Sequence, residues 1–305
     1  MNEIQYSVVV PVYNSSPTLD ELYSRVKKTF EELGPSYEII FVNDGSTDDS
    51  WDKLKEIKDS DPDRVTAVRL SKNFGQHNAT FCGFNFARGK FILTLDDDLQ
   101  TPPEEMVKLV SSQEEGGFDL VYGIYQKKKH SRTRNLGSKL LKRSASWYGR
   151  PGEGSSFRLI DREVIEKLLV HHQNFVFIDE LLLWYTDNIN FLPVKHEKRK
   201  GTRTGYTFLK LWGMFSNLLI YYTTIPLKIM IYGGLLSSLV FFIMAVIFII
   251  NKLVFDVPLG WSSLIVAICF TTSLILFCLG IIGEYLSRIY MVQNKKPPYS
   301  IARVL

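Results

Sequence analysis

The sequence is poor in cysteine and has no recognisable leader. Its three cysteines, Cys82, Cys269 and Cys278, are odd in number and two lie in very apolar surroundings, so no disulfide framework is predicted. The first residues lack the basic start of a signal peptide, and Pro11 and Asn14 interrupt the short apolar stretch that follows. We therefore expect the front of the chain to stay in the cytoplasm.

Two common nucleotide-binding motifs are also missing. Residues 83–90 have five residues between their glycines where a P-loop has four, and Phe91 stands where Ser or Thr is required. No Gly-x-Gly-x-x-Gly fingerprint follows the first expected strand. These absences disfavour kinase-like and dinucleotide-dependent enzymes. They leave open a nucleotide that is held by Asp44 and a metal.

The chain has little net charge, and that charge is unevenly distributed. Its 305 residues carry a formal charge of +4 and are 46% hydrophobic, which allows one or two domains and excludes a disordered chain. From Thr207 onward there are seven Lys or Arg against two acidic residues, which leaves 29 basic and 30 acidic residues in 1–206. Residues 1–206 are therefore typical of a near-neutral soluble domain. The residues from Thr207 onward differ from them in composition.

Long uncharged runs fill the back of the chain. Residues 229–250 are 22 residues without a charge, enough for a helix to cross a hydrocarbon core of roughly 30 Å. A second run has Pro and Gly near its start, so we expect its helix over 262–283. Basic residues flank the pair, and the positive-inside rule places both ends in the cytoplasm. The sequence predicts a transmembrane hairpin over 228–283 and a cytoplasmic tail over 284–305.

The hairpin has two alternatives. A hydrophobic core hairpin of a soluble protein would need large surrounding domains, which the chain does not possess. Residues 207–227 are interpreted as an interfacial amphipathic helix, because this stretch mixes polar residues with Trp and Tyr side chains typical of the headgroup level. If this stretch were instead a third, shorter span, the orientation of the hairpin would reverse.

The front of the chain alternates short apolar runs with amphipathic patterns. The runs are rich in Val, Ile and Phe and suit strands that are buried on both faces. Between them, apolar residues recur at helical spacing, as at Leu19, Leu22 and Val26. This alternation predicts an α/β domain over 1–206 with a mostly parallel, doubly wound sheet. The expected strands are 6–12, 37–42, 65–70, 91–95 and 119–122.

Polar residues gather where three of the expected strands end. The first strand leaves through Pro11-Val12-Tyr13-Asn14, the second through Asn43-Asp44-Gly45-Ser46, and the fourth through Asp96-Asp97-Asp98-Leu99-Gln100. Taken singly, each motif is ordinary turn or helix-cap chemistry. In doubly wound sheets, however, ligands bind beyond the carboxyl ends of the strands. These exits are therefore the candidate site.

The three consecutive aspartates predict a metal. Such carboxylates repel one another unless a cation or hydrogen-bond donors offset their charge. Asp96 and Asp98 can point to one side of an extended turn, and Gln100 adds a neutral oxygen. This hard-oxygen set suits Mg²⁺ or Mn²⁺ shared with substrate phosphates. A helix start at Thr101-Pro102 is the alternative, and it leaves the triple Asp unexplained.

Two basic stretches complete the candidate residues. Residues 127–143 contain eight Lys or Arg and no acid, and residues 195–203 contain five more against Glu197. One interpretation is a solvated face, or attraction to anionic lipid headgroups. The other is a phosphate clamp, for which Arg is the preferred bidentate donor. Nucleic acid is disfavoured, because neither a recognition-helix nor an aromatic-platform pattern accompanies the bases.

In this order, the motifs resemble the glycosyltransferase family 2 enzymes that act on polyprenyl phosphates. These include dolichyl-phosphate mannose synthases and bacterial undecaprenyl-phosphate glycosyltransferases. The resemblance covers essentially the whole chain, and it also rests on Ser71-Lys72-Asn73-Phe74-Gly75, Ser156-Phe157-Arg158-Leu159 and residues 199–206. It implies a GT-A fold, an enzyme of the inner (cytoplasmic) membrane with its catalytic domain in the cytoplasm, and homo-oligomers, often tetramers.

The resemblance also implies roles for individual residues. Metal binding and catalysis are implied for Asp96, Asp98 and Gln100. Nucleotide-sugar binding is implied for Pro11, Tyr13, Asn14, Asp44, Lys72, Asp96 and Asp97. Binding of the acceptor phosphate is implied for Lys127, Arg132, Arg134, Ser138, Arg158 and Arg199. Three departures matter: Tyr125 stands where many relatives have Arg, Ser156 replaces an Asp that is sometimes assigned as a base, and Gly201 lies one place early in the pattern of residues 199–206.

The implied reaction moves a sugar from a nucleotide diphosphate sugar, preferably a UDP-sugar such as UDP-glucose, to undecaprenyl or another polyprenyl phosphate, with inversion. The product would serve cell-envelope glycans such as lipopolysaccharide. A phosphate monoester has its second pKa near about 6, so the acceptor is already an anion at neutral pH and needs no general base. The loss of a carboxylate at Ser156 is therefore tolerable.

Four alternatives stay open at this point. The donor can be GDP-mannose, or the acceptor another lipid, in which case a base such as Asp179 or Glu180 would be needed. A processive polysaccharide synthase generally needs a Gln-x-x-Arg-Trp motif, which the sequence lacks. A non-catalytic membrane scaffold would account for the bases and spans but not for Asp96 to Asp98.

Overall fold

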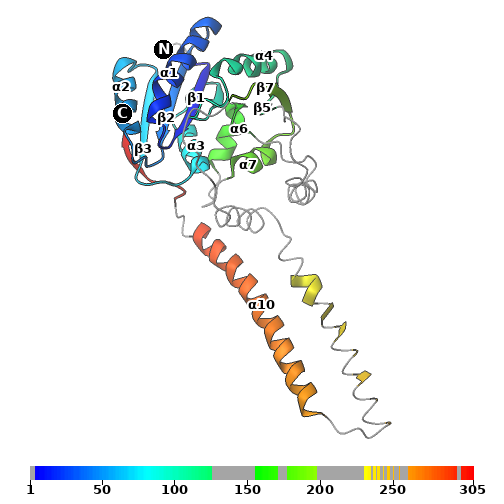
Figure 1. Cartoon of the computed structure of the whole chain (residues 1–305). Helices are drawn as coiled ribbons and strands as arrows, with labels where there is room; N and C mark the ends of the chain where they lie inside the picture. The colour runs from blue at the N-terminus through cyan, green and yellow to red at the C-terminus, as the bar shows by residue number, and fades with distance from the viewer. Residues whose placement is uncertain are drawn as a thin grey trace. The chain divides into compact units, whose positions relative to one another are not determined.

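The computed structural model describes residues 4–125, 155–170, 177–197, 260–293 and 297–305, together with 230–234 and single positions from there to 254. The chain divides into two compact units. One consists of Met1–Arg203 and Pro297–Leu305, and the other of Thr204–Lys296. Figure 1 shows the elements of both.

The first unit is built on one eight-stranded sheet with the strand order β7-β5-β6-β4-β1-β2-β3-β8. The central strands β4, β1, β2 and β3 are parallel to one another. β6 is antiparallel to both β4 and β5, and β8 is antiparallel to β3. The strands are β1 (Tyr6–Val12), β2 (Tyr37–Asn43), β3 (Val65–Leu70), β4 (Phe91–Thr94), β5 (Leu120–Tyr125), β6 (Arg158–Asp161), β7 (Ile189–Val194) and β8 (Ile301–Val304). The predicted α/β fold with a mostly parallel sheet is confirmed.

Helices follow most of the strands and pack against the sheet. α1 presents one apolar face to it, on which Leu19, Leu22, Val26 and Phe30 are buried. α1 begins with Pro near its first turn and ends at Gly34, whose φ of 93° is the left-handed conformation that glycine adopts without cost. The helices of this unit are α1 (Ser16–Leu33), α2 (Ser50–Ser60), α3 (Gln76–Phe84), the 3₁₀ helix η1 (Pro103–Glu105), α4 (Met106–Gly116), α6 (Arg162–Leu169) and α7 (Ile178–Tyr185).

β1 lies at the centre of the hydrophobic core. All seven of its residues are buried, and it pairs with β2 on one side and β4 on the other. Tyr6 at its start stacks on Phe91, with ring centroids 5.7 Å apart, and lies 5.8 Å from the ring of Phe30. Tyr6 also pairs in register with Tyr37 of β2 and Phe91 of β4, so the carboxyl ends of the three parallel strands meet at one edge.

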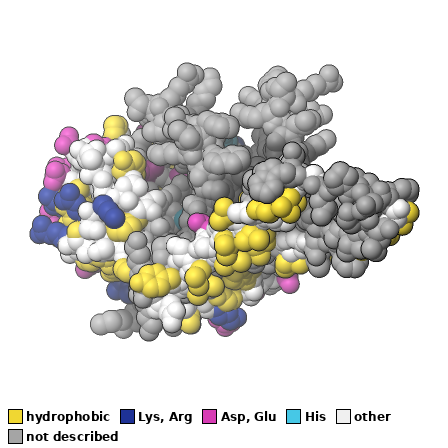
Figure 2. Space-filling model, turned by 90° about the horizontal axis from the view of Figure 1, so that it is seen from below, with side chains coloured by type: hydrophobic (Ala, Val, Ile, Leu, Met, Phe, Trp, Pro, Cys, Tyr) yellow, Lys and Arg dark blue, Asp and Glu magenta, His cyan; other side chains and the backbone are white. Residues whose placement is uncertain are grey.

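The second unit contains the long helix α10 (Trp261–Gln293), which has 33 residues. Within the described residues, α10 is the one helix that is long and apolar enough to cross a membrane, with a mean hydropathy of 1.6 over Phe270–Ser287. Most of its apolar side chains whose burial is described are exposed, among them Leu276, Leu279 and Leu286. Figure 2 shows hydrophobic side chains gathered on the face seen from below. The expected helix 262–283 lies within α10. The expected interfacial helix 207–227 lies outside the described residues, as do nine of the 22 positions of the first expected span, 229–250; the span's other positions are helical.

The last residues of the chain belong to the first unit, where the sequence had indicated only a tail. β8 pairs with β3 and joins Val68 with Val304. The amide of Ser71 donates to the carbonyl of Ser300 at 2.9 Å, beyond the end of the strand. Figure 1 shows this red strand beside β3 at the edge of the sheet. β8 therefore covers the hydrogen-bonding edge that β3 would otherwise expose.

Tyr299 provides the side-chain anchor of this C-terminal segment. Its ring meets the ring of Phe81 edge-on at 6.4 Å, and its hydroxyl accepts a hydrogen bond from the side chain of Asn85 at 3.0 Å. The side chains of β8 itself are exposed, Ile301 by 41%. Main-chain pairing and Tyr299 therefore hold the segment on β3 and α3.

We predict that Tyr299→Ala destabilises the first unit. The change removes an aromatic contact and a hydrogen bond, so the thermal unfolding midpoint of the detergent-purified protein should fall by roughly 4–8 °C. Ile301→Ala is the matched control, because it trims an exposed side chain in the same segment and should shift the midpoint by less than about 2 °C. Equal shifts in the two variants would contradict the anchoring role of Tyr299.

Candidate functional site

The polar exits predicted from the sequence meet at one edge of the sheet. β1, β2 and β4 are parallel neighbours, so the loops that follow them lie side by side. Two further segments join them: residues 71–76, which lead from β3 into α3, and residues 155–157, which precede β6. Contacts between these five segments build the candidate site.

Asn14 ties the exit of β1 to that of β2. Its φ of 52° is left-handed, a conformation that Asn tolerates better than most residues. Its amide donates to Oγ of Ser46 at 3.0 Å, and its Oδ1 accepts from the amide of Thr47 at 2.8 Å. Of the neighbouring predicted residues, Pro11 is buried in β1 and Tyr13 is 46% exposed. The side chain of Tyr13 is therefore accessible at this edge.

Asp44 is buried where β2 ends. Its two carboxylate oxygens accept hydrogen bonds from the amides of Phe74, at 2.7 Å, and Gly75, at 2.9 Å. Burial raises the pKa of Asp44, and the two backbone donors oppose that rise. The Asp44 carboxylate therefore holds the loop between β3 and α3 against the exit of β2.

The same two loops touch at Gly45. Its φ is 65°, and a Cβ at this position would lie 2.5 Å from the carbonyl carbon of Lys72, so no other residue fits without a shift of the backbone. The side chain of Lys72 is exposed, with Nζ 5.3 Å from the centroid of the Phe74 ring. A cationic side chain therefore lies beside the exit of β2.

Asp97 fastens the exit of β4 to the start of α1. Its Oδ2 accepts from the amide of Tyr13 at 2.9 Å and from Oγ of Ser15 at 2.6 Å. Thr18 Oγ1 donates to the main-chain carbonyl of Asp97 at 2.7 Å. Burial raises the pKa of Asp97 to about 6, while the two donors to its carboxylate lower it. All of these contacts are with other residues of the protein. The assignment of Asp97 to nucleotide-sugar binding therefore stays a prediction.

Asp96 is held by donors on both carboxylate oxygens. The side-chain amide of Gln76, at the start of α3, donates to Oδ1 at 2.5 Å, and Oγ of Ser156 donates to Oδ2. Burial raises the pKa of Asp96, the Ser156 donor lowers it, and the negative charge of Asp98 raises it again. Hydrogen-bond donors therefore offset part of the repulsion expected between these aspartates.

Asp98 closes a tight turn at the same exit. Its Oδ1 accepts from the amide of Gln100 at 3.1 Å across Leu99, which is buried and has a left-handed φ of 57°. The carbonyl of Gln100 accepts from the amide of Glu197 at 2.7 Å. In the described part of the chain, no group of three or more His, Cys, Asp or Glu is arranged to hold a metal.

Arg158 was assigned from the sequence to the acceptor phosphate, and its observed partners are protein groups. Its side chain is only 3% exposed, pairs through Nη1 with Asp179, and donates through Nε to Thr94 Oγ1 at 3.2 Å. The phosphate role stays a prediction. The other residues assigned to the acceptor phosphate lie outside the described residues: Lys127, Arg132, Arg134, Ser138 and Arg199.

Three residues of the observed site carried little signal in the sequence. Gln76 follows directly after the Ser71 to Gly75 motif, and Ser156 appeared only as a departure from a family pattern. Asp179 entered only as a base for a rival reaction. Their contacts with Asp96 or Arg158 join segments that are 20 to 60 residues apart in the chain, and a local pattern does not reveal such pairings.

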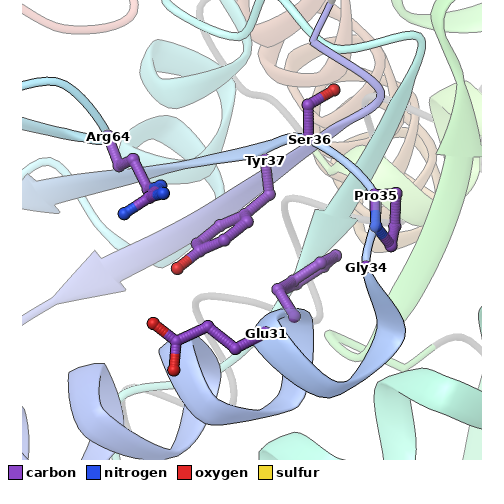
Figure 3. A pocket seen from close by; sticks show the side chains of 7 residues that line it. Glu31, Gly34, Pro35, Ser36, Tyr37 and Arg64 are labelled. Atoms are coloured by element: carbon purple, nitrogen blue, oxygen red, sulfur yellow. The ribbon is translucent and has the colours of Figure 1, made fainter.

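A separate pocket lies at the other end of the strands and includes none of these residues. Figure 3 shows it around Tyr37, the first residue of β2, with Arg64 over the ring at 5.4 Å. It is lined by Phe30, Glu31, Gly34, Pro35, Ser36, Tyr37 and Arg64. The pocket is therefore remote from the polar exits of β1, β2 and β4.

Comparison with known proteins gives consistent matches. Residues 7–169 match the family model described as Glycosyl transferase family 2. The undecaprenyl-phosphate 4-deoxy-4-formamido-L-arabinose transferase of Proteus mirabilis (strain HI4320) is 34% identical over 310 residues, which cover 98% of this chain and 93% of that protein. The protein of the same name from Enterobacter sp. (strain 638) is 32% identical with the same coverage.

Solved structures with a similar fold are more distant. Glucosyl-3-phosphoglycerate synthase from Mycobacterium tuberculosis, in complex with Mn²⁺ and UDP-glucose, is 20% identical and covers 71% of this chain and 77% of its own, with a TM-score of 0.48. TarS 1–349 of S. aureus, in complex with UDP-GlcNAc, is 17% identical and covers 71% and 66%, with a TM-score of 0.47.

The family match lies within the unit that carries the polar strand exits, and the curated relatives align with nearly the whole chain. The resemblance found in the sequence motifs is therefore confirmed. We conclude that the chain is a member of glycosyl transferase family 2.

Proposed function

We propose that the protein is a membrane-bound, inverting glycosyltransferase that moves a sugar from a UDP-sugar to undecaprenyl phosphate or a similar polyprenyl phosphate. The observation that carries the proposal is the alignment of 98% of the chain with relatives named as undecaprenyl-phosphate sugar transferases. The polar exits of β1, β2 and β4 support it, because they gather carboxylates and a lysine where a nucleotide sugar would bind.

The sugar is proposed from the relatives. Three of them are named for 4-deoxy-4-formamido-L-arabinose, so UDP-4-deoxy-4-formamido-L-arabinose is the first donor to test. UDP-glucose, which the sequence analysis preferred, is the second. Both share the UDP group that Pro11, Tyr13, Asn14, Asp44 and Lys72 are proposed to bind.

A divalent cation fits the Asp96 and Asp98 carboxylates. The charge of Asp98 raises the pKa of Asp96, and a cation bound to both carboxylates would relieve this repulsion. Mg²⁺ is typically bound by one or two carboxylates together with substrate phosphates, and Gln100 offers a further oxygen in the same turn. When bound, Mg²⁺ or Mn²⁺ would neutralise charge on the departing UDP.

The acceptor needs positioning and no general base. At neutral pH a polyprenyl phosphate is already largely an anion, so its oxygen can attack the anomeric carbon directly. The basic residues Lys127, Arg132, Arg134 and Arg199, with Ser138, are proposed to hold this phosphate against repulsion from the donor. A single in-line displacement breaks the bond to UDP and inverts the anomeric centre.

The membrane anchor is proposed to be a hairpin. Residues 229–250 and helix α10 are both long enough to cross the bilayer. Residues 1–203 precede this stretch and β8 follows it, and both belong to the catalytic unit. A chain that leaves and re-enters one cytoplasmic domain must cross the membrane an even number of times. Two crossings meet this condition.

The first prediction from the proposed function concerns the reaction. Detergent-purified protein should form a lipid-linked sugar from undecaprenyl phosphate and one member of a panel of labelled UDP- and GDP-sugars, in the presence of Mg²⁺ or Mn²⁺. EDTA should abolish the product, and added metal should restore it. If the protein neither binds nor transfers any donor in the panel, the catalytic proposal fails and a membrane scaffold is favoured.

The second prediction concerns Asp98. Asp98→Ala should lower kcat/KM for the donor by about 100-fold or more, because it removes a proposed ligand of the metal. Asp63→Ala is the matched control, since it removes an exposed carboxylate from the turn before β3 and should leave kcat/KM unchanged. Full activity of Asp98→Ala would exclude a metal site at this turn.

The third prediction concerns topology. In a variant without the three native cysteines, a cysteine at Asp256 should be labelled from the opposite face of sealed vesicles to one at Asp63. A cysteine at Ser300 should be labelled from the same face as Asp63, because both belong to the first unit. Labelling of Asp256→Cys and Asp63→Cys from the same face would rule out the hairpin.

A further inference from the structure

A partly buried chain of hydrogen bonds runs from Asp96 into the interior of the first unit. Oγ of Ser156 donates to Oδ2 of Asp96, and Oγ1 of Thr94 donates to the main-chain carbonyl of Ser156. Nε of Arg158 donates to the same Thr94 hydroxyl oxygen at 3.2 Å. Nη1 of Arg158 in turn pairs with Asp179 on α7. Each residue in this chain is thus fixed by the next.

The sheet determines where Ser156 lies. Thr94 on β4 pairs in register with Arg158 on β6. Ser156 and Phe157, which precede β6, therefore lie beside the exit of β4. Phe157 is held from the other side by β5, because the amide of Gly123 donates to its carbonyl at 2.9 Å. A Cβ on Gly123 would come within 2.4 Å of the Phe157 ring, so the strands pack closely here. The backbone of Ser156 is therefore held beside Asp96.

Asp179 belongs to the same chain of hydrogen bonds. Its Oδ1 accepts a hydrogen bond from the hydroxyl of Tyr122 at 3.1 Å as well as the ion pair with Arg158. The Arg158 side chain is almost fully buried, and a buried guanidinium is tolerated only when it is paired and hydrogen-bonded. Asp179 therefore keeps Arg158 in place. It is poorly suited to serve as a general base, the role that a lipid-hydroxyl acceptor would have required.

The opposite oxygen of Asp96 completes the arrangement. Gln76 donates to Oδ1 from α3, while Ser156 donates to Oδ2 from the start of β6. Two donors on different elements fix the plane of the carboxylate before any ligand arrives. Preorganisation of this kind lowers the cost of binding a ligand in one geometry.

We propose that Ser156 and Asp179 are positioning residues of the nucleotide-sugar site. Ser156 orients the Asp96 carboxylate directly, and Asp179 acts through Arg158 and Thr94 on the backbone of Ser156. The inference rests on the proposed function of Asp96 in binding the nucleotide sugar and its metal. Ser156 stands where an Asp is sometimes assigned as a base. The inference gives Ser156 a different role, as a hydrogen-bond donor to Asp96.

The test compares Ser156→Ala with Ser156→Thr in the detergent-purified full chain. The dissociation constant of UDP in the presence of Mn²⁺ is measured by calorimetry, and KM and kcat are measured separately for donor and lipid acceptor. Ser156→Ala should weaken binding of UDP with Mn²⁺ and raise the donor KM by roughly tenfold, since a hydrogen bond to a carboxylate is lost. The KM for the lipid phosphate should not change.

Conservative and distant variants serve as controls. Ser156→Thr retains a hydroxyl and should return the UDP dissociation constant to within about threefold of the unmodified protein. Ser60→Ala removes a serine hydroxyl at the end of α2 and should leave both KM values unchanged. Asp179→Asn should raise the donor KM more than it lowers kcat, whereas a general base would lose kcat and alter the pH profile.

Separate outcomes decide the inference and the function on which it rests. If Ser156→Ala binds UDP with Mn²⁺ as tightly as the unmodified protein, the positioning role is wrong, even when sugar transfer to undecaprenyl phosphate is normal. If the unmodified protein binds UDP but transfers no sugar, the proposed function fails, and the binding comparison still decides the role of Ser156. If Asp179→Asn unfolds, the Ser156 variants carry the test alone. If the unmodified protein does not bind UDP, both proposals fall.

Discussion

Carboxylates at the ends of β2 and β4 can lie in one partly buried site only because the chain surrounds them with hydrogen-bond donors. Asp44 receives two backbone amides, and Asp97 receives an amide and a hydroxyl. Asp96 receives Gln76 and Ser156. Without these donors, burial and mutual repulsion would favour protonated carboxyls, which bind cations poorly. The loops of the first unit supply these donors.

This requirement explains why the site is assembled from so many segments. The donors come from the loop between β3 and α3 and the first residue of α3, from the residues between β1 and α1, and from Ser156 before β6. Pairings among β1, β2, β3, β4 and β6 in one sheet bring them to the carboxyl edge. The antiparallel pairing of β4 with β6 is the least expected of these, yet it delivers Ser156 to Asp96. A substrate would then bind to carboxylates that are already ordered.

The sequence predicted the parts of this arrangement that follow from local patterns. The bounds of β1 and β3 coincide with the expected strands 6–12 and 65–70, because short runs rich in Val, mostly buried, are a strong strand signal. The acidic exits were also predicted, since parallel strands bring their carboxyl ends together. Gln76 and Ser156 were not, because a single uncharged polar residue has no signature until the fold places it beside a carboxylate.

The C-terminal region illustrates the same limit. α10 continues ten residues beyond the expected end at 283, because Glu284 and Arg288 end the apolar run without ending the helix. β8 has four residues with exposed side chains and a charged Arg303 in its middle, so it lacked any strand pattern. Its pairing with β3 spans more than two hundred residues and returns the chain to the first unit. The first unit therefore contains residues from both sides of the apolar stretch.

The central claim is that the ordered carboxylates at the exit of β4 receive the metal and diphosphate of a nucleotide sugar. The most direct measurement is an experimental structure of the full chain with UDP and Mn²⁺, in which anomalous scattering locates the manganese. The account predicts manganese in contact with a carboxylate oxygen of Asp96 or Asp98, with Ser156 still donating to Asp96. Manganese and UDP bound elsewhere, or Ser156 turned away from an ordered Asp96, would contradict it.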